Sequence, residues 1–287
     1  TLTATNPDGA TLTWDNGVSD GVAFNASTTT TYSVTADLAG CIASDNVVIT
    51  VNTTPIVDDL SDQEVCDSYT LPAISGTDLT GGASYYTGSG GVGPVTAGTA
   101  LTSTSTLFIY DETGTSPNCS TEESVTITIN NTPIVDDLVD QDVCDSYTLP
   151  TINGTDLTGG ASYYTGSGGV GPVTAGTAIT STSTLFIYDA TGTTPNCSTE
   201  ESVTITINAT PSITAVGTNP TTCGGSDGII TITGLVNSTS YTDLIFDGTS
   251  QGGITSTATG TYVISGLSAG TYAPITIENE GCVSNIV

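Results

Sequence analysis

The chain has no lysine, no arginine and no histidine among its 287 residues. Without these side chains it can form no side-chain salt bridge, no Schiff base, no phosphate clamp and no catalytic triad with an imidazole base. Its 29 Asp and Glu residues give a formal net charge of −29, which repels nucleic-acid phosphates and anionic membrane surfaces. We therefore expect no enzyme activity, no catalytic residues and no nucleic-acid partner.

Long apolar runs and helical periodicity are missing as well. No stretch is long enough to cross a bilayer, so no membrane insertion is expected. Short segments instead alternate apolar and polar residues, as where Val125, Ile127 and Ile129 share one face and threonines the other. Turns rich in Gly, Asn and Pro separate these segments. The pattern predicts an all-β protein made of antiparallel β-sandwich domains, which the resemblance described below identifies as Ig-like.

A repeat sets the size of those domains. Residues 54–130 recur at residues 132–208 with only seven conservative differences. The differing positions are Ser61/Val139, Glu64/Asp142, Ala73/Thr151, Ser75/Asn153, Leu101/Ile179, Glu112/Ala190 and Ser116/Thr194. The predicted domains are a truncated first segment (residues 1–52), a first repeat (53–130), a second repeat (131–208) and a last segment (209–287), truncated at its last strand. Short joints with Pro55, Pro133 and Pro211 predict a semi-rigid rod.

The seven cysteines follow the repeat, with one early and one late in each full domain. The predicted intradomain disulfides are Cys66–Cys119, Cys144–Cys197 and Cys223–Cys282. Cys41 aligns with the late cysteines, and its partner is expected just upstream of Thr1. No two cysteines are close in sequence and histidine is absent, which disfavours zinc. Disulfides indicate an oxidising compartment.

Acidic residues cluster beside the proline joints and raise the question of a metal. The cluster contains Asp58, Asp59 and Asp62 in the first repeat, and Asp136, Asp137 and Asp140 in the second. Carboxylate oxygens are hard ligands that suit calcium, so calcium is the one cofactor that the sequence suggests. The spacing matches no EF-hand loop. A solubilising acidic patch that protects a strand edge is the alternative.

Aromatic residues are few, and each repeat contains one adjacent pair of tyrosines. Tyr85 with Tyr86, and Tyr163 with Tyr164, lie beside glycine-rich loops. One tyrosine of each pair should face the core and the other solvent. An exposed tyrosine could stack on a sugar or another surface ligand; a structural tyrosine that covers a sheet edge is the alternative. Trp14 is interpreted as a core residue of its own domain.

Several motifs resemble a known family. The first segment contains Thr-Leu-Thr-Trp-Asp-Asn-Gly and Ala-Gly-Cys and resembles the Ig-like or PKD-like repeats of giant Bacteroidota surface proteins. The last segment contains Cys-Gly-Gly-Ser-Asp-Gly and Gly-Leu-Ser-Ala-Gly-Thr-Tyr and is similar to the SprB repeat of gliding-motility adhesins. The middle repeats, with Val-Cys-Asp-Ser-Tyr-Thr-Leu-Pro, resemble repeats of the same proteins. The resemblance implies export by type IX secretion, display on the cell surface, and partners in the gliding machinery.

These observations favour a structural repeat segment of a secreted adhesin filament that serves attachment and gliding. Neighbouring repeats of the same chain and a surface or polysaccharide ligand are the other expected partners. Two alternatives stay open. The first is an array of carbohydrate-binding modules attached to a secreted enzyme, and the second is a protective surface coat.

Overall fold

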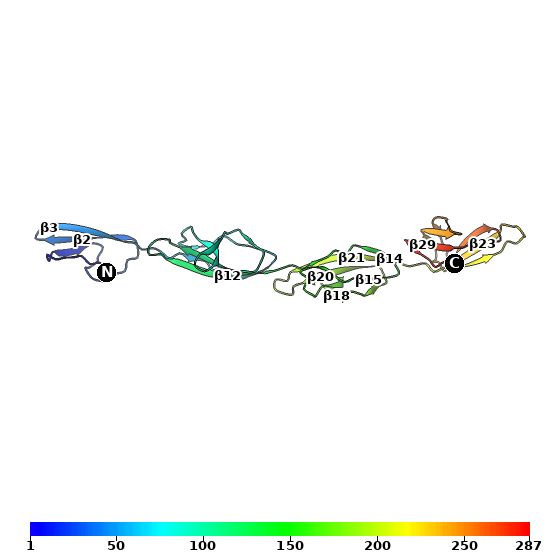
Figure 1. Ribbon diagram of the computed structural model, residues 1–287, viewed down its shortest axis with the longest axis horizontal. Helices are drawn as coiled ribbons and strands as arrows, with labels where there is room; N and C mark the ends of the chain where they lie inside the picture. The colour runs from blue at the N-terminus through cyan, green and yellow to red at the C-terminus, as the bar shows by residue number, and fades with distance from the viewer. The chain divides into compact units, whose positions relative to one another are not determined.

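The computed structural model describes residues 1–287, and its regular elements are all β-strands (Figure 1). The predicted all-β class is confirmed. The model contains no helix that is long and apolar enough to cross a membrane. The chain forms two compact units, Thr1–Asn130 and Asn131–Val287. No sheet crosses any of the predicted domain boundaries.

The first repeat is built on a five-stranded sheet with the order β5-β12-β11-β8-β9, flanked by the two-strand pairs β4-β7 and β10-β6. Its strands are β4 (Ile56–Val57), β5 (Gln63–Cys66), β6 (Tyr69–Thr70), β7 (Gly76–Thr77), β8 (Ser84–Gly88), β9 (Val92–Val95), β10 (Ala100–Leu101), β11 (Ser105–Glu112) and β12 (Ser120–Asn130). Alternation of apolar and polar residues places Leu107 and Ile109 of β11 inside, where each is 2% exposed. They pack with Val125 and Ile127 of β12 to form the core.

The second repeat has the same topology, since its five-stranded sheet runs β14-β21-β20-β17-β18. Its strands are β13 (Ile134–Val135), β14 (Gln141–Cys144), β15 (Tyr147–Thr148), β16 (Gly154–Thr155), β17 (Ser162–Gly166), β18 (Val170–Val173), β19 (Ala178–Ile179), β20 (Ser183–Ala190) and β21 (Ser198–Asn208). A core of its own contains Leu185, Ile187, Val203 and Ile205. Each repeat thus folds around a separate core.

One feature departs from the predicted antiparallel sandwich. β5 pairs with β12 in parallel, with Gln63 opposite Ile127 and Cys66 opposite Asn130. β14 pairs with β21 in the same way and brings Cys144 opposite Asn208. The early cysteine of each repeat therefore lies at the end of the long strand where the next domain begins.

The first segment contains only one layer of a sandwich. β1 (Thr11–Trp14), β2 (Thr30–Leu38) and β3 (Cys41–Ile49) form an antiparallel sheet in that order. Tyr32 and Val34 are its buried hydrophobic residues. Trp14 lies opposite Val34 on the inner face, as expected of a core position, but it stays partly exposed.

The last segment contains two sheets of more than two strands, β22-β23-β28 and β26-β25-β29-β30. Its strands are β22 (Thr214–Thr218), β23 (Gly228–Thr233), β24 (Ser240–Tyr241), β25 (Asp243–Phe246), β26 (Thr249–Ser250), β27 (Ile254–Thr255), β28 (Tyr262–Leu267), β29 (Ile275–Asn279) and β30 (Cys282–Val283). Both sheets contribute to one core that includes Ile232, Leu244 and Ile277. The segment is thus a two-layer sandwich.

Candidate functional site: the joint between repeats

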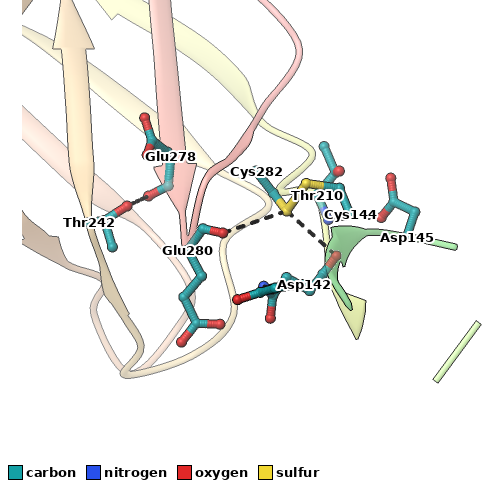
Figure 2. Close-up of a disulfide and its surroundings, with 9 residues drawn as sticks. Asp142, Cys144, Asp145, Thr210, Thr242, Glu278, Glu280 and Cys282 are labelled. Atoms are coloured by element: carbon teal, nitrogen blue, oxygen red, sulfur yellow. Dashed lines mark hydrogen bonds between the residues drawn. A yellow bond between two sulfur atoms is a disulfide. The ribbon is translucent and has the colours of Figure 1, made fainter. Parts of the chain in front are cut away.

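A disulfide joins the second repeat to the last segment at the point where the chain passes between them (Figure 2). Cys144 and Cys282 are bonded with their Cα atoms 5.7 Å apart, although 138 residues separate them in sequence. Cys282 is almost fully buried, and its sulfur lies 3.8 Å from the carbonyl oxygen of Asn208, the last residue of β21. The bond therefore closes the joint and not a single domain.

Side-chain contacts support the joint on either side of this disulfide. The carboxylate of Asp145 accepts a hydrogen bond of 2.8 Å from the backbone N–H of Thr210. That contact holds the pKa of Asp145 below its ordinary value, because the Thr210 backbone and side chain both donate to the carboxylate. Asp142 accepts from the amide of Asn208 at 2.6 Å. Asn208 is thus hydrogen-bonded to β14 of the second repeat, and Thr210 at the start of the last segment is hydrogen-bonded to Asp145 just after β14.

The predicted intradomain disulfides are wrong. Cys144 is bonded to Cys282, while Cys119 and Cys223 are free thiols. Cys66 and Cys197 also belong to disulfides. The reason is the direction of β5: Cys66 lies opposite Asn130, and Cys119 precedes the first residue of the same long strand. Eleven residues of strand span about 36 Å, whereas a disulfide requires Cα atoms less than about 7 Å apart.

The first segment and the first repeat meet in a similar way. The side-chain amide of Asn52 donates to the carbonyl oxygen of Pro117 at 2.7 Å and to the hydroxyl of Thr115 at 2.8 Å. The sulfur of Cys119 lies 3.9 Å from the carbonyl oxygen of Asn52. This contact reproduces that of Cys282 with Asn208, except that Cys119 has no disulfide partner.

The acidic residues proposed as calcium ligands do not converge. The structure holds no group of three or more Asp, Glu, His or Cys side chains that could bind a metal ion. Asp62 instead accepts a hydrogen bond of 2.7 Å from the backbone N–H of Thr126, and Asp140 accepts one from Thr204. The remaining members of the predicted set, Asp58, Asp59, Asp136 and Asp137, are exposed. Calcium binding stays a prediction, without a preformed site to support it.

The tyrosine pairs divide as expected, one inward and one outward. Tyr85 is 1% exposed and donates its hydroxyl to the carbonyl oxygen of Pro72, so the proposed ligand contact by Tyr85, and by its copy Tyr163, is wrong. Burial raises the pKa of both phenols. Tyr86 lies opposite Phe108 on the outer face and meets Tyr110 edge to face, with ring centroids 5.9 Å apart. Tyr164 and Tyr188 repeat this arrangement.

A carboxylate holds the glycine-rich loop beside each outer tyrosine. Glu122 accepts hydrogen bonds from the Gly90 backbone N–H at 2.5 Å and from the Ser89 hydroxyl at 2.7 Å. Glu200 makes the same contacts with Gly168 and Ser167. These contacts fix the glycine-rich loop on the outer face of each repeat.

No protein-family model and no curated protein matches the chain. Solved structures similar to it include Sidekick-1 immunoglobulin domains 1–5, at 12% identity and TM-score 0.31, with 99% of this chain and 75% of that chain covered. Titin domains I67–I69 reach 10% identity and TM-score 0.31, with 82% and 98% covered. Mouse cadherin-23 EC22–24 reaches 14% identity and TM-score 0.24, with 63% and 75% covered. The sandwich architecture of this chain is defined by the sheets described above.

Proposed function

We propose that the chain is a structural repeat segment of an extracellular adhesin, in which a disulfide across a joint links one β-sandwich domain to the next. The observation that carries the proposal is the bond between Cys144 and Cys282, which connects one repeat to the next segment. A disulfide in this position resists separation of neighbouring domains. Resistance of that kind is useful in a chain that transmits force, and it adds nothing to catalysis.

Composition supports an extracellular and non-enzymatic role. Disulfides persist in oxidising compartments. The absence of Lys, Arg and His removes most catalytic groups, and two nearly identical domains in tandem are typical of a chain that works through length or number. The motif resemblance narrows the proposal to a gliding-motility adhesin of the SprB type, exported by type IX secretion and displayed as a filament. Its partners would then be neighbouring repeats, the gliding machinery and a surface ligand.

Surface display is tested on intact cells of the producing organism. Antibodies against residues 53–208 should label these cells without permeabilisation, and deletion of the gene should reduce attachment and gliding. Labelling that appears only after permeabilisation would overturn the extracellular assignment. Normal attachment and gliding in the deletion strain would overturn the adhesin role.

A second candidate, a carbohydrate-binding module, is favoured by one observation. Tyr86, Phe108 and Tyr110 lie together on the outer face of the first repeat, and aromatic faces stack on sugar rings. Affinity electrophoresis against soluble polysaccharides tests this function. A Tyr86→Ala/Tyr164→Ala variant should lose retardation by the polysaccharide, while a matched Val92→Ala/Val170→Ala variant on the neighbouring strands should keep it. Equal retardation of all three proteins would remove the candidate.

A further inference from the structure

Eight positions of the chain carry the tripeptide Asn-X-Ser/Thr, in which X is any residue except proline. This tripeptide is the acceptor sequence for N-linked glycans, which are attached at the surface of secreted proteins. The tripeptide alone does not select among the eight. The amide nitrogen itself forms the new bond, so a folded chain offers an acceptor only where that amide is exposed and free of other hydrogen bonds. The eight asparagines are Asn25, Asn52, Asn118, Asn130, Asn153, Asn196, Asn208 and Asn237.

Three of these asparagines are held where one segment of the chain meets the next. Asn52 is half-buried, and its amide donates to two groups of the first repeat. Asn130 is half-buried and donates to the carboxylate of Glu64 at 3.0 Å. Asn208 is buried and donates to the carboxylate of Asp142 at 2.6 Å. Their amides are engaged in the joints and are not available to a modifying enzyme.

Asn118 lies in the loop between β11 and β12 and is exposed, yet three hydrogen bonds hold its side chain. Its amide nitrogen donates to the carboxylate of Glu112 at 2.7 Å. Its carbonyl oxygen accepts from the Gly114 N–H at 2.9 Å and from the hydroxyl of a neighbouring threonine at 3.1 Å. The hydroxyl of Tyr110 donates to Glu112 at 2.8 Å, and Tyr110 is also hydrogen-bonded to Ser120, the third residue of the tripeptide. Both polar side chains of this tripeptide are therefore engaged.

The second repeat has the same loop without the carboxylate. Ala190 stands in the position of the glutamate, and this is the only one of the seven differences between the repeats that changes the charge. Asn196 is exposed and keeps one of the three contacts, a hydrogen bond of 2.8 Å from the Gly192 N–H to its carbonyl oxygen. Its amide nitrogen has no hydrogen-bond partner. The loop backbone is unchanged, since the Thr191 N–H donates to the carbonyl oxygen of Cys197 at 2.9 Å, as the equivalent residues do in the first repeat.

The other exposed asparagines of the set have no matched copy. Asn25, Asn153 and Asn237 are exposed, but the position equivalent to Asn153 in the first repeat is a serine. The loops that contain Asn118 and Asn196 share the tripeptide Asn-Cys-Ser and differ in the state of the asparagine amide. They therefore form an internal comparison within one chain.

We propose that Asn196 is the acceptor of an N-linked glycan and that Glu112 prevents the same modification at Asn118. The donor is an oligosaccharide on a lipid pyrophosphate, and the catalyst is an oligosaccharyltransferase. The amide nitrogen of Asn196 attacks the anomeric carbon of the first sugar. The C–N bond forms, the C–O bond to the pyrophosphate breaks, the nitrogen loses one proton and the lipid pyrophosphate leaves. The exposed Ser198 completes the tripeptide.

In the cell, this modification rests on the extracellular location proposed above, because the transfer takes place outside the cytoplasm. Protein purified from the producing organism shows whether it occurs. After reduction, chymotrypsin cleaves behind Tyr110 and Tyr188, and the two resulting peptides differ in mass at two of the seven differing positions. Enzymatic release of N-linked glycans in heavy-oxygen water converts a modified asparagine to a labelled aspartate. We expect the label at Asn196 and none at Asn118.

A reconstituted reaction tests the same difference without the cell. The folded, unglycosylated chain is incubated with a purified oligosaccharyltransferase that recognises Asn-X-Ser/Thr and with its lipid-linked oligosaccharide. Asn196 should be modified at least about tenfold faster than Asn118, whose amide must first leave a charge-assisted hydrogen bond. Glu112→Ala should raise the rate at Asn118 to that at Asn196. Asp59→Ala, which removes an exposed carboxylate elsewhere in the first repeat, should not.

Peptides separate the folded contact from the local sequence. Peptides of residues 111–122 and 189–200 lack the folded loop and should be modified at equal rates, and unequal rates would overturn the role of Glu112. Equal modification of Asn118 and Asn196 in the folded chain, no modification of Asn196, or an unchanged rate at Asn118 in Glu112→Ala would also overturn the proposal. So would an unmodified Asn196 in protein that antibodies detect on intact cells. Detection only after permeabilisation contradicts the extracellular location instead, and the reconstituted reaction then decides whether Asn196 is an acceptor.

Discussion

Asp111 and its copy Asp189 are the most buried carboxylates of the two repeats, at 1% exposure each. Asp111 accepts hydrogen bonds from both the backbone N–H and the hydroxyl of Thr80, and from the N–H of Glu112. A chain without basic side chains thus satisfies a buried carboxylate with backbone and hydroxyl donors. These contacts fix the loop before β8 against the end of β11.

Replacement of this carboxylate should destabilise one repeat and leave the other as an internal reference. Asp111→Ala removes the acceptor for the Thr80 N–H, and a buried donor without a partner costs about 1–3 kcal/mol. Urea unfolding should split into two transitions, with the first repeat unfolding at lower urea. Asp59→Ala, at an exposed position of the same repeat, is the control and should leave the unfolding curve unchanged. An unsplit curve for Asp111→Ala would contradict the role given to this carboxylate.

Glu122 gives the outer-face loop a dependence on pH. The Gly90 N–H and the Ser89 hydroxyl hold the pKa of Glu122 below its ordinary value, and Glu200 is shifted in the same direction by its own contacts. A lowered folded-state pKa means that the contact stabilises the loop above the unfolded pKa of about 4.3 and is lost as pH falls through the folded pKa.

The amide resonance of Gly90 should report this loss. It should stay constant from neutral pH down to about 4.3 and shift only below that value. Glu122→Gln should abolish the shift at Gly90 while the Gly168 resonance, held by Glu200, still moves. A Gly90 resonance that titrates unchanged in the variant would show that another group causes it.

At the scale of the element, Asp62 connects β5 to the sheet through the N–H of Thr126. Asp62→Ala should therefore speed amide exchange at Thr126 and along β5, with Asp140 and Thr204 in the second repeat as the unchanged control. Because Asp62 is already hydrogen-bonded and no acidic group converges on a metal position, added calcium should not reproduce or relieve this effect. Calorimetric calcium binding that disappears in the variant would instead establish Asp62 as a ligand.

Periodicity was sufficient to predict the long strands β11 and β12. The alternation in β12 places Val125, Ile127 and Ile129 inside as expected, and the division of Tyr85 from Tyr86 follows from the same period of two. The direction of the short strand β5 could not be predicted in this way. Four residues carry no signal that distinguishes parallel from antiparallel pairing, yet that direction places Cys66 beside Asn130.

The cysteine pairing was missed for a related reason. Every full domain supplies one early and one late cysteine, so pairing within a domain and pairing between successive domains satisfy the same count. The joint residues Asn208 and Thr210 were missed because their role depends on backbone groups, which every residue type carries. The prolines mark where a joint lies but not which side chains meet there.

For the whole molecule, a disulfide across a joint changes what a pulling force must break. A bond within a domain protects that domain and leaves the connection to its neighbour to noncovalent contacts. The Cys144–Cys282 bond instead bypasses the residues between the two cysteines, so force passes through the bond before it reaches either core. An array linked in this way would extend little under load until its disulfides are reduced.

Single-molecule pulling on the full chain measures this bypass directly. Handles attached by non-thiol chemistry at the exposed Asp137 and at Val287 should give almost no unfolding extension in the oxidised protein. Reduction should release the chain between the bonded cysteines, whose sequence separation is 138, for a gain of about 480 Å at roughly 3.5 Å per residue. A Cys144→Ser/Cys282→Ser variant should show that gain without reductant.

If the cysteines were paired within domains, Cys144 with Cys197 and Cys223 with Cys282, reduction would add two separate lengths of about 190 Å and about 210 Å. The oxidised chain would then already extend at the joint, which would exclude the linkage across it.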